Sequence, residues 1–551
     1  PLLSADDEVL RDLDSARDLM TAALCEPGSG PGRYTAAQAA TARRSLERAV
    51  LASEKLALRA SEAQLEARLN GAGGVSEGGI SEEEGRVSGA VVRGLPKPQL
   101  GCLVHNDRFT EPLQKTVGAT FDFLASPMRW NEIESEEGRY NFRSTDRWIE
   151  WAVRQGRLPV HAGPVLDFHP RAFPSWATVW EHDYETLREF AYEHCARVAK
   201  RYRRAVRRWI ALSGPTVTAG VKFSIDQWVD LARLSTLAIR KAAPNASVSV
   251  EISLPFGQHP GGSESVVSPR FFAEMLLHAG VQFDSLALRI QMGSASIGES
   301  SRDLMQLSAL IDDFASYEHM IDVSVLGVPS GIASGEASHL DPGGWRGAAS
   351  PETQARFVTQ ALTVLMGKAA VRSVAWQALY DAESRPEQRD GGLVSVAGRA
   401  KPALTAVQAV SRALREGRAP TRVAPAAAGG ASSGWWWRSR GGGCGGWGVG
   451  GGVGVWGGGG WGGGGGVGGG GGWGAGAGGV WRVDVNGASA AELSVLPGIG
   501  PSLAGRIVEL RERRGGFGRV EELDDVRGIG VKRLAGVRPW VRVGEGEGWE
   551  E

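Results

Sequence analysis

Three carboxylates lie at places in the chain where they could act together as acids and bases. Asp167, Glu251 and Asp381 each fall near the end of a short apolar run that reads as a buried strand. Proton transfer to and from a substrate needs such side chains held within reach of one another. They are candidates for an acid and base set. The alternative is that they are solvated or ion-paired carboxylates with a structural role.

Two Gly-Ile-Gly turns near the C-terminus carry a different chemistry. Each turn precedes a predicted helix, whose first backbone N–H groups and dipole favour a phosphate. The glycines allow close approach of a sugar-phosphate backbone, and the isoleucines anchor the turns in a core. Contact with phosphates alone predicts salt-sensitive binding of double-stranded DNA without sequence preference. The candidate residues are Gly498, Ile499, Gly500, Ser502, Gly528, Ile529, Gly530, Lys532 and Arg533.

The acidic residues around the second turn leave another interpretation open. Glu521, Glu522, Asp524 and Asp525 dilute the basic surface of this segment. A paired turn of this kind could then serve as a structural unit or bind another protein.

Composition sets the broad limits. The chain has 551 residues, 42% of them hydrophobic, which is enough for several domains with a sizeable core. The formal charge of -1 gives no global attraction to nucleic acid, so any such binding must be local.

The four cysteines are far apart, which argues against a zinc ribbon or a disulfide scaffold. No apolar run has the length of a membrane-spanning helix. The first residue, Pro1, indicates a processed or truncated start, which leaves the localisation open.

The middle of the chain predicts an α/β fold in which eight short apolar runs alternate with helices. The arrangement is that of a (β/α)8 TIM barrel; a doubly wound sheet is less suitable because no GxGxxG follows the first run. The helices include residues 184–203, 225–242 and 351–365. The expected strands are residues 100–104, 121–125, 158–162, 209–212, 247–252, 285–290, 321–326 and 371–376.

The N-terminal residues predict a helical hairpin. Residues 5–24 and 35–70 place leucines at helical spacing, Thr35 with Gln38 has the form of a capping box, and Asn70-Gly71 is a plausible stop. The hairpin should pack on the next domain, with self-association as the alternative.

Several motifs of the barrel segment resemble glycoside hydrolase family 10, the xylanase family. Residues 127–130, 137–142 and Asp146 are similar to its second-strand signature, and residues 163–169 with 174–176 to its third. Residues 374–376, Tyr380-Asp381 and 401–404 are similar to its eighth strand and closing helix. The resemblance implies a TIM barrel whose site lies at the carboxyl ends of the strands.

The family's two catalytic glutamates have no counterpart at the matching positions. The resemblance places Gly214 where the acid/base would follow strand 4, and Val325 where the nucleophile would stand on strand 7. Neither side chain can transfer a proton or attack an anomeric carbon. Aromatic residues remain, which implies a polysaccharide at the barrel mouth, although large aromatics are also ordinary core. The carbohydrate-binding candidates are Trp130, Phe168, His169, Trp176 and Trp376.

The C-terminal module resembles the tandem helix-hairpin-helix domain of competence DNA receptors of the ComEA type, a bacterial family. Its two Gly-Ile-Gly turns join predicted helices at residues 489–496, 502–513 and 531–537. The Gly/Trp-rich tract before it reads as a linker. The expected organisation is a hairpin (1–71), a linker (72–97), a barrel (98–416), a linker (417–480), the helix-hairpin-helix module (481–543) and an acidic tail (544–551).

These features predict a two-module protein. The barrel is expected to be catalytically inactive and to bind glycan or act as a scaffold, and the C-terminal module to bind DNA. One alternative is an active glycoside hydrolase on xylan-like β-glycans that uses displaced carboxylates. Another is a gene-model fusion of two unrelated proteins, because nearly all residues of the Gly/Trp tract can be encoded by codons of G and T. No cofactor and no metal site are expected, because no cluster has metal-ligand spacing.

Overall fold

The chain divides into two compact units, Pro1–Trp456 and Gly457–Glu551, which are considered separately. The division falls inside the tract that the sequence marks as a linker. The computed structural model describes residues 7–25, 35–71, 97–216, 219–257, 267–294, 296, 298–331, 344–382, 390–420, 483–488, 493, 499, 501–530, 534, 537–538 and 541–543.

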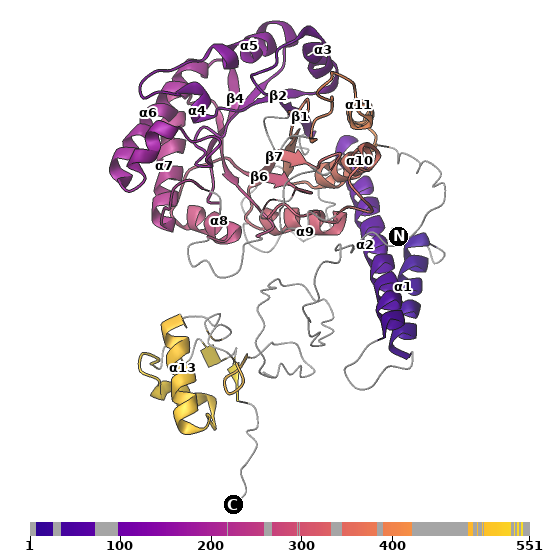
Figure 1. The fold of residues 1–551 in the computed structure, drawn as a ribbon, viewed down its shortest axis with the longest axis vertical. Coiled ribbons are helices and arrows are strands. Elements are labelled where there is room, and N and C mark those ends of the chain that lie inside the picture. The colour runs from indigo at the N-terminus through magenta and orange to yellow at the C-terminus, as the bar shows by residue number, and fades with distance from the viewer. Residues whose placement is uncertain are drawn as a thin grey trace, which may run out of the picture. The chain divides into compact units, whose positions relative to one another are not determined.

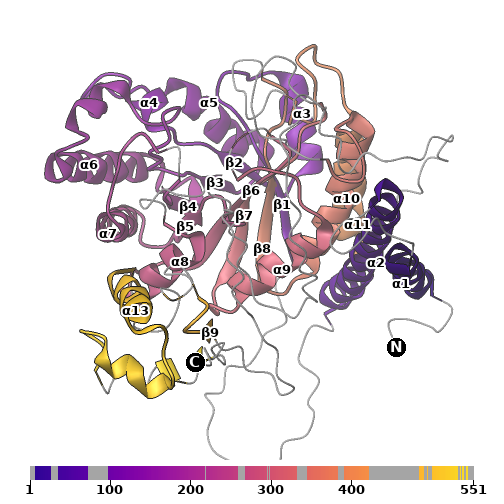
Figure 2. The same ribbon diagram turned by 60° about the horizontal axis from the view of Figure 1, so that its bottom comes forward.

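Eight parallel strands close into a barrel in chain order, with helices between the strands as a TIM barrel requires (Figures 1 and 2). All eight runs predicted as strands form strands. Their bounds are β1 Gln99–Leu103, β2 Phe123–Ser126, β3 Val160–Ala162, β4 Val206–Ser213, β5 Ser247–Ile252, β6 Ser285–Gln291, β7 Met320–Gly327 and β8 Val371–Trp376.

Helices cover the outside of the barrel, and several begin with side-chain caps that the sequence encodes. Ser224 with Gln227 and Asp303 with Gln306 form capping boxes at the starts of α7 and α9. The helices are α3 Glu111–Thr120, α4 Trp130–Ile133, α5 Arg143–Trp151, α6 Tyr184–Tyr202, α7 Ile225–Ala242, α8 Pro269–His278, α9 Leu304–Ala315, α10 Pro351–Gly367 and α11 Pro402–Arg415.

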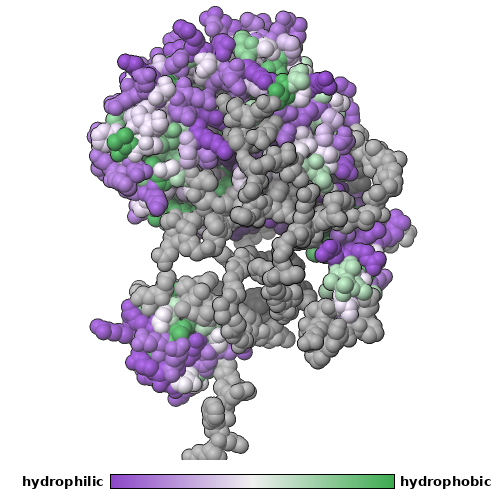
Figure 3. Space-filling view, viewed as in Figure 1, coloured by the Kyte–Doolittle hydropathy of each residue, from purple (hydrophilic) through white to green (hydrophobic). Residues whose placement is uncertain are grey.

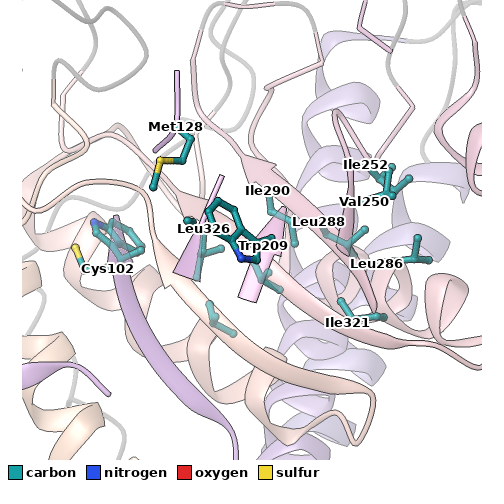
Figure 4. Close-up of a cluster of buried hydrophobic side chains, with 14 of the residues drawn as sticks. Cys102, Met128, Trp209, Val250, Ile252, Leu286, Leu288, Ile290, Ile321 and Leu326 are labelled. Carbon is teal, nitrogen blue, oxygen red and sulfur yellow. The ribbon is translucent and has the colours of Figure 1, made fainter. Parts of the chain in front are cut away.

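The main core lies between the strands and these helices. In β5 and β6, Val250, Ile252, Leu286, Leu288 and Ile290 are buried among other apolar side chains (Figure 4). The residues between them are polar or small and turn to the barrel axis, because successive side chains of a strand point to opposite faces. The sequence predicted buried apolar strands, and the structure shows that the axis-facing side of β5 and β6 is largely polar.

The N-terminal hairpin, α1 Glu8–Cys25 and α2 Ala36–Leu69, packs on the barrel as predicted (Figure 1). The capping box at Thr35 and the stop at Asn70 are both present. α2 lies against α9 and α10. Buried Glu54 accepts hydrogen bonds from the Leu304 amide (3.0 Å) and the Trp345 indole (2.6 Å).

The other end of α2 is fixed to the end of α10. Arg68 donates to the carbonyls of Met366 (2.9 Å) and Val371 (2.9 Å). Since α10 runs away from the carboxyl end of β7, α2 points in the same direction along it. The first half of α2, with α1, therefore projects beyond the face of the barrel where the strands end.

The C-terminal unit has a small core of its own, which includes Ile499, Ile507, Phe517 and Ile529. Helix α13 Pro501–Arg514 confirms the predicted central helix, and a 3-10 helix follows at Val520–Asp525. Most of the predicted helices at 489–496 and 531–537 lies outside the described residues. The sequence did not predict the parallel pairing of β9 Val483–Asp484 with β10 Val541–Arg542.

On the face of the barrel unit that Figure 3 shows, hydrophobic side chains are scattered among hydrophilic ones. Of the helices that the structure describes, none combines the length and hydropathy needed to cross a bilayer.

Candidate functional sites

A cavity of about 260 Å³ opens at the carboxyl ends of the strands and continues into the barrel. Each of the eight strands contributes to its lining. In most TIM barrels three layers of bulky side chains fill this space. Here Ala125, Ser249 and Ala375 line it instead, so small side chains leave the interior partly open.

Glu251 on β5 is the buried carboxylate of the upper part of the cavity. It accepts hydrogen bonds from Ser213 of β4 (2.8 Å) and Ser324 of β7 (2.6 Å), and Ser213 is also 2.9 Å from Ser253. Burial raises the pKa of Glu251, and the nearby charge of Asp167 raises it further, while Arg289 and the two hydroxyls lower it. The net shift is upward, so Glu251 holds its proton more tightly than an exposed glutamate.

Asp167 and His169 line the same cavity. One carboxylate oxygen of Asp167 accepts the backbone N–H of His169 at 2.9 Å, and the His169 ring accepts the N–H of Arg171 at 3.1 Å. The structure therefore brings together two of the three predicted carboxylates, Asp167 and Glu251.

Asp381 has a different environment. Its carboxylate pairs with Lys401 at 2.8 and 2.9 Å and accepts the Gly392 N–H at 2.8 Å. It does not line the cavity. Among the alternatives that the sequence left open, the ion-paired structural role describes this residue.

The positions matched to the family's catalytic glutamates carry no carboxyl group. A Cβ at Gly214 would lie 2.7 Å from the Phe272 ring and 2.9 Å from the Glu251 carbonyl, so a side chain does not fit there without a shift. Val325 lines the cavity with an aliphatic side chain.

The predicted aromatic lining differs from what the structure shows. Trp130, Phe168 and Trp376 are each 1% exposed and pack in the core, because their rings fill the space between strands, loops and helices. Trp176 packs against the same core and donates to the Glu134 carbonyl at 2.9 Å. Of the five candidates, His169 alone lines the cavity.

A charged cluster at the floor of the cavity was not predicted from the sequence. Asp322 of β7 accepts hydrogen bonds from Arg372, Ser285 (2.8 Å) and Ser373 (2.5 Å). Burial pushes the pKa of Asp322 up, but Arg372, the charge of Arg208 and the Ser373 hydroxyl together outweigh burial, and the pKa lies below its ordinary value. A charged residue inside an apolar run, as in Ile321-Asp322-Val323, was the available signal.

Arg208 of β4 and His161 of β3 complete this floor. Burial lowers the pKa of His161 to about 3, with Arg208 as a further cause, so the imidazole is neutral at neutral pH. The His161 ring stacks on Phe123 with centroids 3.9 Å apart.

In the C-terminal unit the second Gly-Ile-Gly turn is described in full. Gly528 has φ of 104°, and a Cβ there would lie 3.0 Å from Leu503. Gly530 is exposed, and a Cβ there would have no neighbour within 4 Å. Ile499 and Ile529 are buried, as predicted. Gly498, Gly500, Lys532, Arg533 and the side chain of Ser502 lie outside the described residues.

The fold and its cavity define a TIM barrel with a polar interior, accompanied by a small helical unit. Residues 96–211, from β1 into β4, match the model of "Glycosyl hydrolase family 10". Residues 481–542 match the model "Helix-hairpin-helix motif".

Individual proteins share shorter stretches. The chain is 44% identical over 57 residues to endonuclease/exonuclease/phosphatase family domain-containing protein 1 of Xenopus laevis, which is 10% of each chain. It is 32% identical over 82 residues to endo-1,4-beta-xylanase B of Thermotoga neapolitana, 15% of this chain and 23% of that protein. The chain thus spans about a tenth to a quarter of the curated relatives it matches.

Among solved structures, xylanase 10B of Thermotoga petrophila in complex with xylobiose aligns with a TM-score of 0.45 and 16% identity, covering 60% of this chain and 99% of that one. Among the described residues, no group of three or more His, Cys, Asp or Glu could hold a metal ion.

Proposed function

We propose that the barrel binds a carbohydrate in its cavity without hydrolysing it by the two-carboxylate retaining mechanism. The observation that carries this proposal is the cavity itself, which opens where TIM-barrel sites lie and is lined by Asp167, Glu251, Gln291 and Gln377. These planar polar groups suit hydroxyl-rich ligands, because each can donate or accept hydrogen bonds in fixed directions. The match of residues 96–211 to a glycosyl hydrolase family supports the same class of ligand.

The lack of hydrolysis is argued from positions 214 and 325. A retaining glycosidase needs two carboxyl groups about 5 to 5.5 Å apart. Glycine and valine occupy the two matching positions. Glu251 accepts hydrogen bonds from a serine of β4, the strand before position 214, and from a serine of β7, the strand that contains position 325. One buried carboxyl group can donate a hydrogen bond to a sugar when it is protonated, but it does not form the pair.

The test is calorimetric titration of the full chain with xylohexaose, beside an assay of reducing-sugar release from xylan. We expect binding without release. Gln377→Ala removes a cavity amide and should weaken binding, whereas Gln64→Ala on the exposed face of α2 should leave it unchanged. No heat of binding with any β-1,4-xylo-oligosaccharide or cello-oligosaccharide would contradict the proposal.

One observation favours hydrolysis as a second candidate. Asp167 and Glu251 line one cavity, and the charge of Asp167 contributes to the raised pKa of Glu251. A carboxylic acid with a raised pKa beside a second carboxylate is the usual division of roles in acid and base catalysis. Release of reducing sugar that Glu251→Gln and Asp167→Asn each abolish would establish this function in place of the first.

For the C-terminal unit we propose binding of double-stranded DNA through phosphate contacts. The support is the match to the helix-hairpin-helix motif and the open space at Gly530, where backbone N–H groups at the turn can meet a phosphate. Binding should fall as salt rises and be similar for unrelated duplexes.

Gly530→Ala is the sharpest test of this proposal, because a Cβ there meets nothing in the protein. The variant should keep the stability of the unit and lose affinity for a 20-base-pair duplex, measured by fluorescence anisotropy. Unchanged affinity, or no binding by the unaltered chain at low salt, would contradict a phosphate contact at this turn.

A further inference from the structure

We infer that the floor of the barrel cavity is an oxyanion site, and that the ligand it takes is a small hydroxylated molecule ending in a carboxylate. The inference rests on Arg208 of β4. It deepens the proposed function, because it concerns the lower part of the same cavity.

The floor carries more positive than negative charge. Arg208 and Arg372 both approach one carboxylate, that of Asp322, and neighbouring His161 is neutral. Arg372 takes both oxygens of Asp322, with Nε at 3.1 Å from one of them and a terminal nitrogen bonded to the other. Ser285 and Ser373 use further acceptor positions of the carboxylate. The acceptor positions of the Asp322 carboxylate are therefore nearly all used before the contact with Arg208 is counted.

The positive charge of Arg208 is therefore only weakly compensated. Among the described residues its hydrogen bonding is a single long contact of 3.4 Å to Asp322. A guanidinium has five N–H donors in a fixed fork that fits a carboxylate or a phosphate. The Arg208 side chain is 22% exposed and lines the cavity, and burial lowers its pKa. A largely buried cation that shares its one counter-anion with a second arginine is only partly compensated, and an anionic ligand would reduce the remaining cost.

The route to this cation is also present. The cavity that Arg208 lines at the floor is the one that Asp167 and Glu299 line nearer the mouth. Small residues at the intermediate level, Ala125, Ser249 and Ala375, leave the passage open. The upper carboxylate, Glu251, has a raised pKa, which reduces its repulsion of an entering anion. Hydroxyls of Ser213, Ser249 and Ser253 along this route suit a hydroxylated body.

The experiment compares gluconate, glucose and inorganic phosphate as ligands of the full chain by isothermal titration calorimetry. Gluconate has a carboxylate at one end and hydroxyls along the rest, glucose has the hydroxyls alone, and phosphate has the oxyanion alone. We expect gluconate to bind roughly tenfold or more tightly than glucose, as one charge-assisted Arg contact allows. Phosphate should compete with gluconate.

Arg208→Gln should abolish the preference for gluconate over glucose and the competition by phosphate. Arg207→Gln is the matched control, because Arg207 is the preceding residue of β4, carries the same charge and is exposed. Arg208→Lys keeps the charge without the planar fork and should bind gluconate with intermediate affinity. Without ligand, the midpoint temperature of thermal unfolding of Arg208→Gln should be no lower than that of the unaltered chain. This measurement also checks that the variant folds.

Equal affinity for gluconate and glucose, or a gluconate affinity unchanged by Arg208→Gln, would overturn the inference. So would phosphate that fails to compete. Xylohexaose binding is measured on the same variants and tests the proposed function separately. If xylohexaose binds while gluconate shows no Arg208-dependent preference, the oxyanion site alone is wrong.

Discussion

Glu251 shows how position within the barrel changes the chemistry of one residue. The sequence could identify it as a strand-end carboxylate but could not reveal its two serine donors, because Ser213 and Ser324 come from strands far apart in the chain. Asp167 reaches the same cavity, whereas Asp381 is held by Lys401. The carboxylates could be found from the sequence; their partners depended on the closure of the barrel.

The raised pKa of Glu251 predicts a pH-dependent stability. A carboxyl group with a folded-state pKa above the unfolded value of 4.5 binds protons more tightly when folded. Its contribution is therefore fully present below pH 4.5 and is lost as pH rises through the folded-state pKa. Glu251→Gln removes this loss and should therefore raise the stability of the barrel at pH 7.

Thermal unfolding of the barrel between pH 4 and pH 8 measures the effect. The advantage of Glu251→Gln should disappear at the acid end of the range. Glu150→Gln serves as the control, because the Glu150 side chain is 56% exposed. An advantage that is the same at all pH values would show that ionisation of Glu251 is not its cause.

A change at the Asp381–Lys401 ion pair should lower the stability of the barrel, where Glu251→Gln raises it. Both side chains are about 90% or more buried and face each other at 2.8 Å, so removal of one leaves the other as a buried charge. Lys401→Met should destabilise the barrel by about 3 kcal/mol, and the double change with Asp381→Asn should recover part of the loss. Urea unfolding of Lys401→Met, Asp381→Asn and the double variant decides this. If the double variant loses the sum of the two single losses, the residues do not act as a pair.

At the scale of elements, the order and type of the barrel strands followed from the sequence, because apolar runs and capping residues are local signals. The alternation within the strands was harder to predict. Ser249 and Glu251 in β5, or Arg289 and Gln291 in β6, face the axis, and only the closed barrel makes that face a cavity wall. The N-terminal helices were predicted, the second with its capping box, but their attachment through Glu54 and Arg68 depends on contacts 250 and 298 residues away in the chain.

Glu54 links the N-terminal hairpin to the loops at the cavity mouth, and its replacement measures how much that link stabilises them. Its carboxylate holds the start of α9 through Leu304 and the segment before α10 through Trp345 and Arg346 (2.6 Å). Glu54→Ala leaves these donors without a partner in a buried site and should cost about 3 kcal/mol. Limited proteolysis should then cut near residues 344–350 sooner. Glu66→Ala, on the exposed side of the same helix, should change neither stability nor cleavage.

At the scale of the whole molecule, the sequence separated the two modules by composition, and the structure places a core in each unit. The apolar cluster of the barrel unit and that of the C-terminal unit have no residue in common. The sheet that joins residues 483–484 to 541–542 was beyond sequence reasoning, because two-residue strands leave no periodic signal.

Separate cores predict two unfolding transitions in calorimetry of the full chain, a larger one from the barrel unit and a smaller one from the C-terminal unit, since unfolding enthalpy scales with size. Gly528→Ala should lower only the smaller transition, because φ of 104° strains any residue with a Cβ and the added atom meets Leu503. The expected loss is about 1 to 3 kcal/mol. Glu54→Ala should lower only the larger transition.

A duplex DNA should raise the temperature of the smaller transition alone, and xylohexaose that of the larger alone, because a ligand stabilises the unit it binds. If one variant or one ligand shifted both transitions together, the two units would be coupled, and the description of the chain as two independent modules would be wrong.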